Sequence, residues 1–282
     1  MSEETGNPAA ESTTDDAALP FVAPCRELRP AATLDWVRQG WHDMWSAPRQ
    51  SLTYGTIVVL LSWTLAGIAL KWGGYFELLV LILGFILIAP VLAVGTYAIS
   101  DQLERGLRPR LRSCLSEERR CFGNLMVFAL MLLVVFLVWW RAGSAVHIFF
   151  PLDPESTDWR DYVEFFGIGS AVGAIFASVV FSAAAFSLPM LVDRRVDSVT
   201  AVVSSVNAVL RNKPTMLAWG LIIALAVAPG YALLFIGRER GASLALVMAL
   251  LGITLPLIGH ATWHAYKQAI DASAYPKDAP AD

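Results

Sequence analysis

Two histidines one helical turn apart, His260 and His264, are the side chains of this sequence that come closest to a reactive site. This i, i+4 spacing can place both imidazoles on one metal ion or at the edge of a haem. A structural zinc site, however, needs about four ligands and a catalytic one about three. The other histidines, His42 and His147, are expected near opposite membrane faces. We therefore keep His260 and His264 as a metal candidate, predict no haem or metal cofactor, and favour an interfacial belt of polar side chains for this end of the chain.

Three consecutive charged residues, Asp193, Arg194 and Arg195, follow a long apolar stretch. They could form an ion pair or contact a phospholipid headgroup, and solvated charges at a membrane edge are the interpretation we favour. The centres of the apolar segments contain no Asp, Glu, Lys, Arg or His. Because an ionisable group in hydrocarbon costs about 2.5–3.5 kcal/mol or more, this pattern argues against energised transport.

The sequence lacks other motifs of known chemistry. The sequence has no phosphate-binding glycine loop, no hydrolase nucleophile elbow and no basic nucleic-acid module. Its three cysteines, Cys25, Cys114 and Cys121, lack the paired spacing of zinc or redox sites. We therefore predict that the protein is not an enzyme and does not bind nucleic acid.

Composition points to a membrane protein, because 56% of the residues are hydrophobic and only 16% are charged. About 20 apolar residues suffice to cross a bilayer as a helix. Six segments meet this length, and we expect an all-α, polytopic bundle of six transmembrane helices. The predicted spans lie near 52–71, 76–99, 122–140, 165–189, 216–236 and 242–259.

The distribution of Lys and Arg predicts the orientation of these spans, since cytoplasmic loops retain positive charge. The segment before the first span carries four, the loop between the second and third spans six, the loop between the fourth and fifth four, and the C-terminal segment two. Five of the 21 basic residues remain for the opposite side. We expect both termini in the cytoplasm of a bacterial cell, with an acidic external loop at 142–164.

The spans form three consecutive hairpins, and each second span contains a proline, Pro90, Pro189 or Pro256, where we expect a helix kink. An amphipathic helix is expected before each hairpin, near 34–45, 107–120 and 196–211. The sequence thus predicts three parallel repeats of an interfacial helix followed by a transmembrane hairpin. Chance similarity among hairpins is the alternative.

Small residues recur at four-residue spacing in the fourth span, at Gly169, Gly173 and Ala177. Such a face allows close helix approach. We favour packing inside the bundle over contact with another subunit.

Several short strings resemble a bacterial family of predicted integral membrane proteins, the domain of unknown function 2189, over roughly residues 34–270. The strings are Gly40-Trp41, Ala47-Pro48, Leu52-Thr53-Tyr54-Gly55, Gly95-Thr96-Tyr97, Leu103-Glu104-Arg105-Gly106, 188–194, Leu210-Arg211-Asn212 and 256–264. The resemblance implies a bacterial inner-membrane protein, and some members of that family are provisionally labelled as cytochrome c oxidase components. It implies no catalytic residues.

We accordingly expect a disordered acidic tail at 1–30, a membrane domain at 31–270 and a flexible C-terminal tail at 271–282. The predicted function is structural, lipid-interacting or accessory, with membrane lipids and a membrane protein such as a respiratory oxidase as partners. The alternative is a transporter or channel for an uncharged or lipidic substrate. The sequence does not indicate the oligomeric state.

Overall fold

The computed structural model describes residues 19–72, 92, 94–150, 158–236 and 240–277, and over these residues the fold is all-helical, as predicted. Residues 94–104 are helical and precede a left-handed turn at Gly106. The named helices are α1 (Ala32–Ser46), α2 (Pro48–Trp72), α4 (Leu111–Phe149), α5 (Trp159–Asp193), α6 (Ser198–Arg211), α7 (Lys213–Ile236) and α8 (Arg240–Ala269).

Two helical segments are long and apolar enough to cross a membrane, Cys121–Val146 in α4 and Trp159–Asp193 in α5. The predicted spans 52–71, 216–236 and 242–259 lie within helices α2, α7 and α8. Most of the predicted span 76–99, including Pro90, lies outside the described residues. The two clear candidates belong to one hairpin, and a bundle of six spans remains a prediction.

Prolines decide where the helices near the base of the molecule begin. Pro48 is the first residue of α2, and Pro214 is the second residue of α7. Helix α1 accordingly ends at Ser46 and α6 at Arg211, shortly before these prolines. The middle of the three predicted amphipathic helices, at 107–120, is not a separate helix. Its proline, Pro109, precedes Leu111, and no proline interrupts the chain from there to the end of α4.

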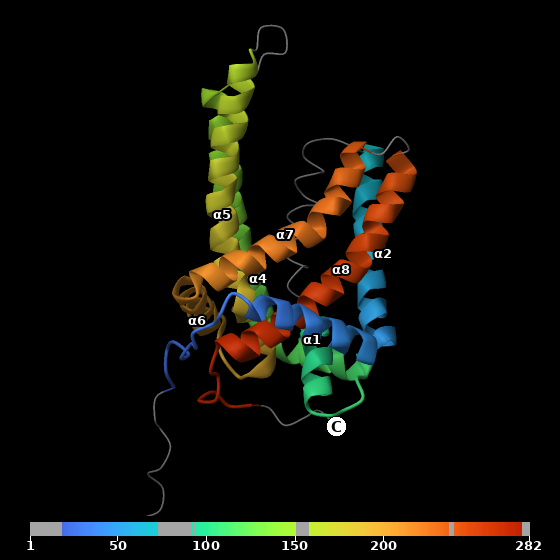
Figure 1. Ribbon diagram of the computed structural model, residues 1–282, viewed down its shortest axis with the longest axis vertical. Coiled ribbons are helices and arrows are strands. Elements are labelled where there is room, and N and C mark those ends of the chain that lie inside the picture. Colours follow the sequence, from blue (N-terminus) through green and yellow to red (C-terminus); the bar gives the residue numbers. More distant parts are fainter. Residues whose placement is uncertain (1–18, 73–91, 93, 151–157, 237–239, 278–282) are drawn as a thin grey trace, which may run out of the picture.

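The α4–α5 hairpin stands beside a second group formed by α2, α7 and α8, with α1 and α6 near the bottom of both (Figure 1). Helix α1 packs mainly on α8, and α6 packs mainly on α5. Helices α7 and α8 change direction along their length in Figure 1 and contain Pro229 and Pro256. Helix α5 continues through Pro189 to its end at Asp193. Pro229 was not among the predicted kinks.

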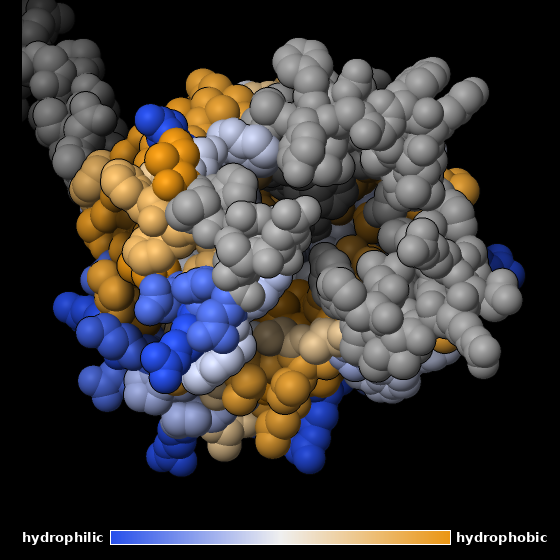
Figure 2. Space-filling model, turned by 90° about the horizontal axis from the view of Figure 1, so that it is seen from above, coloured by the Kyte–Doolittle hydropathy of each residue, from blue (hydrophilic) through white to orange (hydrophobic). Residues whose placement is uncertain are grey.

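The core lies at the base of the molecule, where aromatic side chains pack together out of solvent. Trp36 of α1 meets Trp219 of α7 edge to face at 5.6 Å. Above this layer, α4 and α5 expose large apolar side chains such as Leu137, Phe166 and Ile175. Seen from above, hydrophobic surface reaches the outer edges of the molecule beside a hydrophilic area (Figure 2). An exposed apolar surface of this extent is typical of contact with lipid or with another protein.

Of the two amphipathic helices, α6 turns its small and polar face inward, whereas α1 buries a mixed face. Helix α1 buries Trp36, Gly40 and Asp43 but leaves Trp41 and Trp45 about half exposed. Helix α6 buries three serines, one threonine, two alanines and Val209. Its apolar face is turned outward, with Val199 and Leu210 among the exposed side chains.

Close helix crossings depend on glycines near α8. A Cβ atom added at Gly55 of α2 would collide with the backbone carbonyl of Gly252, and one at Gly259 would collide with the Thr96 side chain. By contrast, a Cβ atom at Gly169 or Gly173 of α5 would meet nothing within 4 Å. The small residues of α5 therefore do not serve the close internal packing that the sequence favoured.

Both ends of the described chain lie against the base rather than apart from it. Residues 19–30, the described part of the predicted tail at 1–30, pair with the chain just after α8 through a bridge between Cys25 and Ile270. Residues 271–277, assigned to a flexible tail, bury Ala272 and Tyr275. Backbone hydrogen bonds of 2.8 Å from Arg26 to Ala269 and from Asp271 to Pro24 join the two segments.

Candidate functional site

The predicted histidine pair lies in a buried hydrogen-bonded network that joins four helical segments. His260 Nε2 lies 2.9 Å from Ser51 Oγ of α2, and His260 Nδ1 lies 2.8 Å from Ser100 Oγ. Ser100 Oγ donates to Asp43 Oδ2 of α1 at 2.8 Å, and His264 Nε2 lies 2.8 Å from the same oxygen. We call these five residues the histidine network.

The donors of the network follow from the single proton of each hydroxyl. Because Ser100 gives its proton to Asp43, its oxygen accepts from His260 Nδ1–H. The neutral imidazole then has only Nε2 as an acceptor, and Ser51 donates to it. His264 donates from Nε2 to the Asp43 carboxylate. The chain of bonds thus ends on one carboxylate that links α1 to α8.

The Ser51–His260 contact has the distance of a nucleophile beside its base, but its surroundings do not suit catalysis. Neither residue exposes any surface, so no substrate carbonyl reaches Ser51 Oγ in this conformation. Both ring nitrogens of His260 already have partners. The described residues contain no group of three or more His, Cys, Asp or Glu that could hold a metal ion.

Electrostatics agree with a neutral His260 and an ionised Asp43. Burial lowers the pKa of His260 to about 4, which outweighs the opposite effect of the Asp43 charge. Burial raises the pKa of the Asp43 carboxyl group, but the hydrogen bond from His264 and the electrostatic effect of the His264 ring together outweigh this increase. The pKa of Asp43 is therefore below its usual value. The network thus combines the neutral imidazole of His260 with the ionised carboxylate of Asp43.

We expect the protein to lose stability as the pH falls from about 6.5 towards 4. The unfolded chain binds a proton at His260 near pH 6.5, whereas the folded chain does so only near pH 4. The contribution of His260 to the free energy of unfolding is therefore fully present above pH 6.5 and decreases by roughly 3 kcal/mol between pH 6.5 and pH 4. Thermal unfolding between pH 7.5 and 4.5 measures it.

The His260→Gln variant should show a shallower decrease over the same pH range, because it no longer takes up this proton on unfolding. His42→Gln is the matched control, since the His42 side chain is 82% exposed. If the stability of His260→Gln decreases with pH as steeply as that of the wild type, another group causes the pH dependence.

A second polar cluster surrounds Asp193, whose side chain is 1% exposed. Asp193 Oδ2 accepts hydrogen bonds from Tyr266 at 2.9 Å and from Arg194 Nε at 3.2 Å. Lys267 Nζ lies 3.5 Å from the same oxygen. Lys277 Nζ lies 3.2 Å from Oδ1 in an ion pair without a hydrogen bond. We call these five residues the Asp193 cluster.

Two more acidic residues extend the Asp193 cluster to the helical segment 94–104. Lys277 Nζ lies 3.3 Å from Asp101 Oδ1, and Lys267 Nζ lies 3.4 Å from Glu104 Oε1. Glu104 also accepts a hydrogen bond from the indole nitrogen of Trp263 at 3.1 Å. Burial and the neighbouring Asp193 raise the pKa of Tyr266 well above its usual value, so its hydroxyl remains a donor. The cluster ties α5, α8 and the C-terminal segment to residues 94–104.

The structure brings together residues that the sequence left apart. The end of the last predicted span does not present His260, Trp263 and Tyr266 as an interfacial belt, because all three side chains are fully buried in protein. Asp193 and Arg194 form an ion pair, and Arg195 is exposed. Sequence reasoning missed Asp43, Ser51 and Ser100, which lie on three other helical segments.

Comparison with known proteins supports the family expectation. The model of a family described as a predicted integral membrane protein, DUF2189, matches residues 78–193. The matched segment includes both clear membrane-span candidates and ends at Asp193. No curated protein and no solved structure matches the chain. The strings quoted before residue 78 and after residue 193 lie outside the match, so the similarity of this chain to the DUF2189 family model covers residues 78–193.

Proposed function

We propose that this is a six-span protein of the bacterial inner membrane, with both termini in the cytoplasm. It acts without catalysis, as a structural or accessory protein that binds membrane lipids and a partner membrane protein. The observation that carries the proposal is the outward apolar surface of both the α4–α5 hairpin and the amphipathic helices α1 and α6. An apolar environment must cover these faces.

The placement of α1 and α6 supports an interfacial position for both. Helix α6 packs mostly small and polar side chains on the bundle and presents apolar side chains outward, and α1 leaves Leu34, Trp41 and Trp45 exposed. Trp41 and Trp45 contact each other edge to face at 5.7 Å on the outer side of α1. Exposed tryptophans are common at the headgroup region. We infer that both helices lie along the cytoplasmic surface.

Three parallel repeats remain part of the proposal. Helix α6 begins the third proposed unit and packs on α5, the last helix of the second. Helix α1 begins the first unit and packs on α8, the last helix of the third. Because α1 and α6 each pack on the last helix of the preceding unit in cyclic order, these two contacts support a shared architecture for the first and third units.

The absence of catalysis is proposed from the state of the reactive groups. The histidine network and the Asp193 cluster use their polar atoms to join helices, and their central side chains are buried. We therefore propose that His260 and His264 hold no metal or haem. Association with a respiratory oxidase rests only on the labels of some family members.

A transporter or channel for a lipidic substrate is the second candidate. It is favoured by an almost wholly apolar groove of about 310 Å³ between α4 and α5. Phe136 and Trp139 of α4 face Gly173 and Phe176 of α5 along it. A groove of this chemistry suits an acyl chain rather than a polar solute.

Purification in a mild detergent from the native membrane tests the proposal. Every co-purifying protein is identified, and haem absorbance, metal content and retained lipid are measured on the same sample. The proposal predicts a reproducible membrane-protein partner or retained phospholipid, with no stoichiometric metal. Oxidase subunits with haem would support the accessory role. Stoichiometric metal lost in both His260→Gln and His264→Gln would contradict the proposal.

A further inference from the structure

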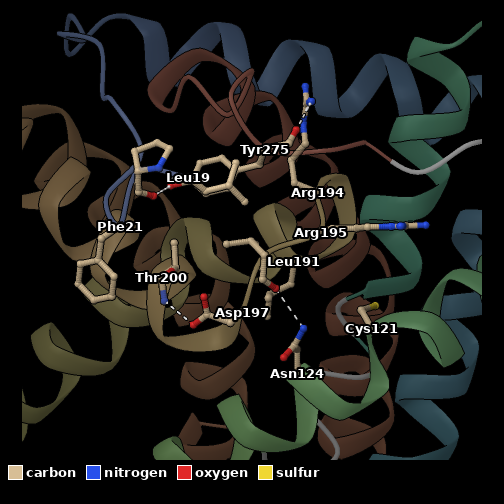
Figure 3. A pocket seen from close by; sticks show the side chains of 12 residues that line it. Leu19, Phe21, Cys121, Asn124, Leu191, Arg194, Arg195, Asp197, Thr200 and Tyr275 are labelled. Carbon is tan, nitrogen blue, oxygen red and sulfur yellow. Dashed lines mark hydrogen bonds between the residues drawn. The ribbon is translucent and has the colours of Figure 1, made fainter. Parts of the chain in front are cut away.

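Several basic side chains at the base of the molecule already have partners inside the protein. Arg194, which lines the pocket of Figure 3, contacts Asp193 at 3.2 Å. Figure 3 shows it beside Tyr275, whose backbone carbonyl accepts a hydrogen bond from the guanidinium at 2.9 Å. Arg105 likewise pairs with Asp101 at 2.7 Å. The charges of these arginines are matched within the fold.

Three other arginines lie where two segments of the base meet. Arg49 is the second residue of α2, and Arg108 and Arg110 flank Pro109 just before α4 begins. The Gln50 side chain donates a hydrogen bond to the Pro109 carbonyl at 2.7 Å, so the start of α2 contacts the loop that leads into α4. We call Arg49, Arg108 and Arg110 the arginine cluster.

The loop that carries two of these arginines is fixed by hydrogen bonds. Gly106 has a φ of 70°, and the N–H groups of Gly106 and Leu107 donate back to carbonyls of the preceding helical segment at 2.9 Å. The Gln102 side chain accepts a hydrogen bond from the Arg110 backbone at 3.1 Å. The fold therefore presents the two arginines of this loop from a defined turn beside α2.

The arginine cluster has no acidic partner among the described residues. All three side chains are exposed, and their guanidinium groups form no ion pair or hydrogen bond within that part of the chain. The two acidic residues of the segment before the loop, Asp101 and Glu104, already pair with Arg105 and Lys267. The cluster is therefore a local concentration of positive charge that an external anion can approach.

Exposed apolar side chains adjoin this positive charge. Leu52 and Leu60 follow Arg49 by 3 and 11 residues, on the same face of α2, and both are exposed. Leu107, next to Arg108, is exposed as well. The outer surface thus changes from arginine to leucine within one helical turn. Such a change matches the passage from phosphate to hydrocarbon in one leaflet of a membrane.

We propose that the arginine cluster binds the phosphodiester of an anionic membrane phospholipid, with the exposed leucines against its acyl chains. Guanidinium groups form charge-assisted, paired hydrogen bonds with phosphate oxygens. A choline headgroup would bring a further cation to three arginines that lack acidic partners. The cluster therefore prefers a headgroup with net negative charge, such as phosphatidylglycerol.

This inference rests on the proposed function, because α2 must cross the membrane for its exposed face to meet acyl chains. A soluble phosphodiester has the same charge but no acyl chains, and it would use the arginines without the leucines. The test therefore compares the two sources of phosphodiester directly.

The test measures binding to the full-length protein in a neutral detergent by native mass spectrometry. The probes are dihexanoyl phosphatidylglycerol, dihexanoyl phosphatidylcholine and glycerophosphoglycerol, which has the anionic headgroup without acyl chains. We expect phosphatidylglycerol to bind about tenfold more tightly than either of the other probes. The preference over phosphatidylcholine should decrease as the ionic strength rises, since salt screens exposed charges.

Variants assign this preference to the cluster. Arg49→Gln, Arg108→Gln and Arg110→Gln should each weaken phosphatidylglycerol binding about fivefold, and the triple variant should bind both lipids equally. Replacing all three by lysine keeps the charges and should retain most of the preference. Arg211→Gln, at the exposed end of α6, is the matched control and should behave as the wild type. Figure 1 shows α6 and the start of α2 on opposite sides of the base.

Equal binding of the two lipids to the wild type, or an undiminished preference in the triple glutamine variant, would overturn the proposal. Glycerophosphoglycerol that binds as tightly as the lipid would overturn its membrane part and assign the cluster to soluble phosphodiesters. Neither result bears on the proposed function, which the purification tests separately. Stoichiometric metal in a protein that still selects phosphatidylglycerol would contradict the proposed function and leave this inference standing.

Discussion

Replacing Gly55 with valine is expected to abolish the recovery of folded protein from membranes. An added Cβ atom at this position would collide with the Gly252 carbonyl oxygen and lie 3.3 Å from Pro256 Cγ. The obstructing atom belongs to the backbone of α8, so it cannot move aside as the tip of a flexible side chain can. Separating α2 from α8 would also disturb the neighbouring histidine network. We expect a cost of about 3 kcal/mol or more.

Gly167→Val in α5 is the matched control for this prediction. It introduces the same side chain into an apolar helix, at a position where a Cβ atom meets nothing within 4 Å. Its cost should stay within about 1 kcal/mol. Size-exclusion profiles and thermal unfolding in one detergent compare the two variants. Equal recovery of both would show that α2 and α8 do not cross as closely as described.

Asp193→Asn is expected to destabilise the protein by about 3–5 kcal/mol, because it removes one partner of a buried ion-pair cluster. The Asp193 side chain is 1% exposed and lies among Arg194, Lys267 and Lys277. Asparagine keeps the shape of the side chain but leaves three positive charges close together. Thermal unfolding at neutral pH measures the loss.

Two further variants make this second prediction specific. Asp271→Asn removes an exposed partner of Arg26, 3.4 Å away, and should cost no more than about 1 kcal/mol. Lys277→Met in the Asp193→Asn background should recover part of the lost stability, since it removes one of the positive charges that Asp193 no longer offsets. Similar stability of Asp193→Asn and Asp271→Asn would show that the Asp193 cluster contributes little.

The helices could be predicted from the sequence because their signals are local. Runs of about 20 apolar residues mark α4 and α5, and Pro48 and Pro214 mark the starts of α2 and α7. The same reasoning failed at 107–120, where periodicity suggested a separate helix. An amphipathic pattern does not end a helix by itself, and no proline follows Leu111 to interrupt it.

The partners of His260 could not be predicted, because nothing in the sequence links them. Ser51, Ser100 and Asp43 are common polar residues on three other helical segments, far from residue 260 in the chain. Only the close packing permitted by Gly40 and Gly259 brings those segments to α8. Amphipathicity was recognised in α1, but the face that packs on protein carries Asp43 beside Trp36 and Met44, and periodicity alone does not reveal which face that is.

Cysteine labelling in intact cells tests the central claim, that the α4–α5 hairpin crosses the membrane with the polar base in the cytoplasm. In a background with all three native cysteines replaced by alanine, single cysteines are introduced at Ser46 in the base and Arg160 near the hairpin tip. A membrane-impermeant maleimide should label Arg160→Cys in intact cells and Ser46→Cys only after permeabilisation. Labelling of both positions from one side would show that the hairpin does not cross and would contradict the account.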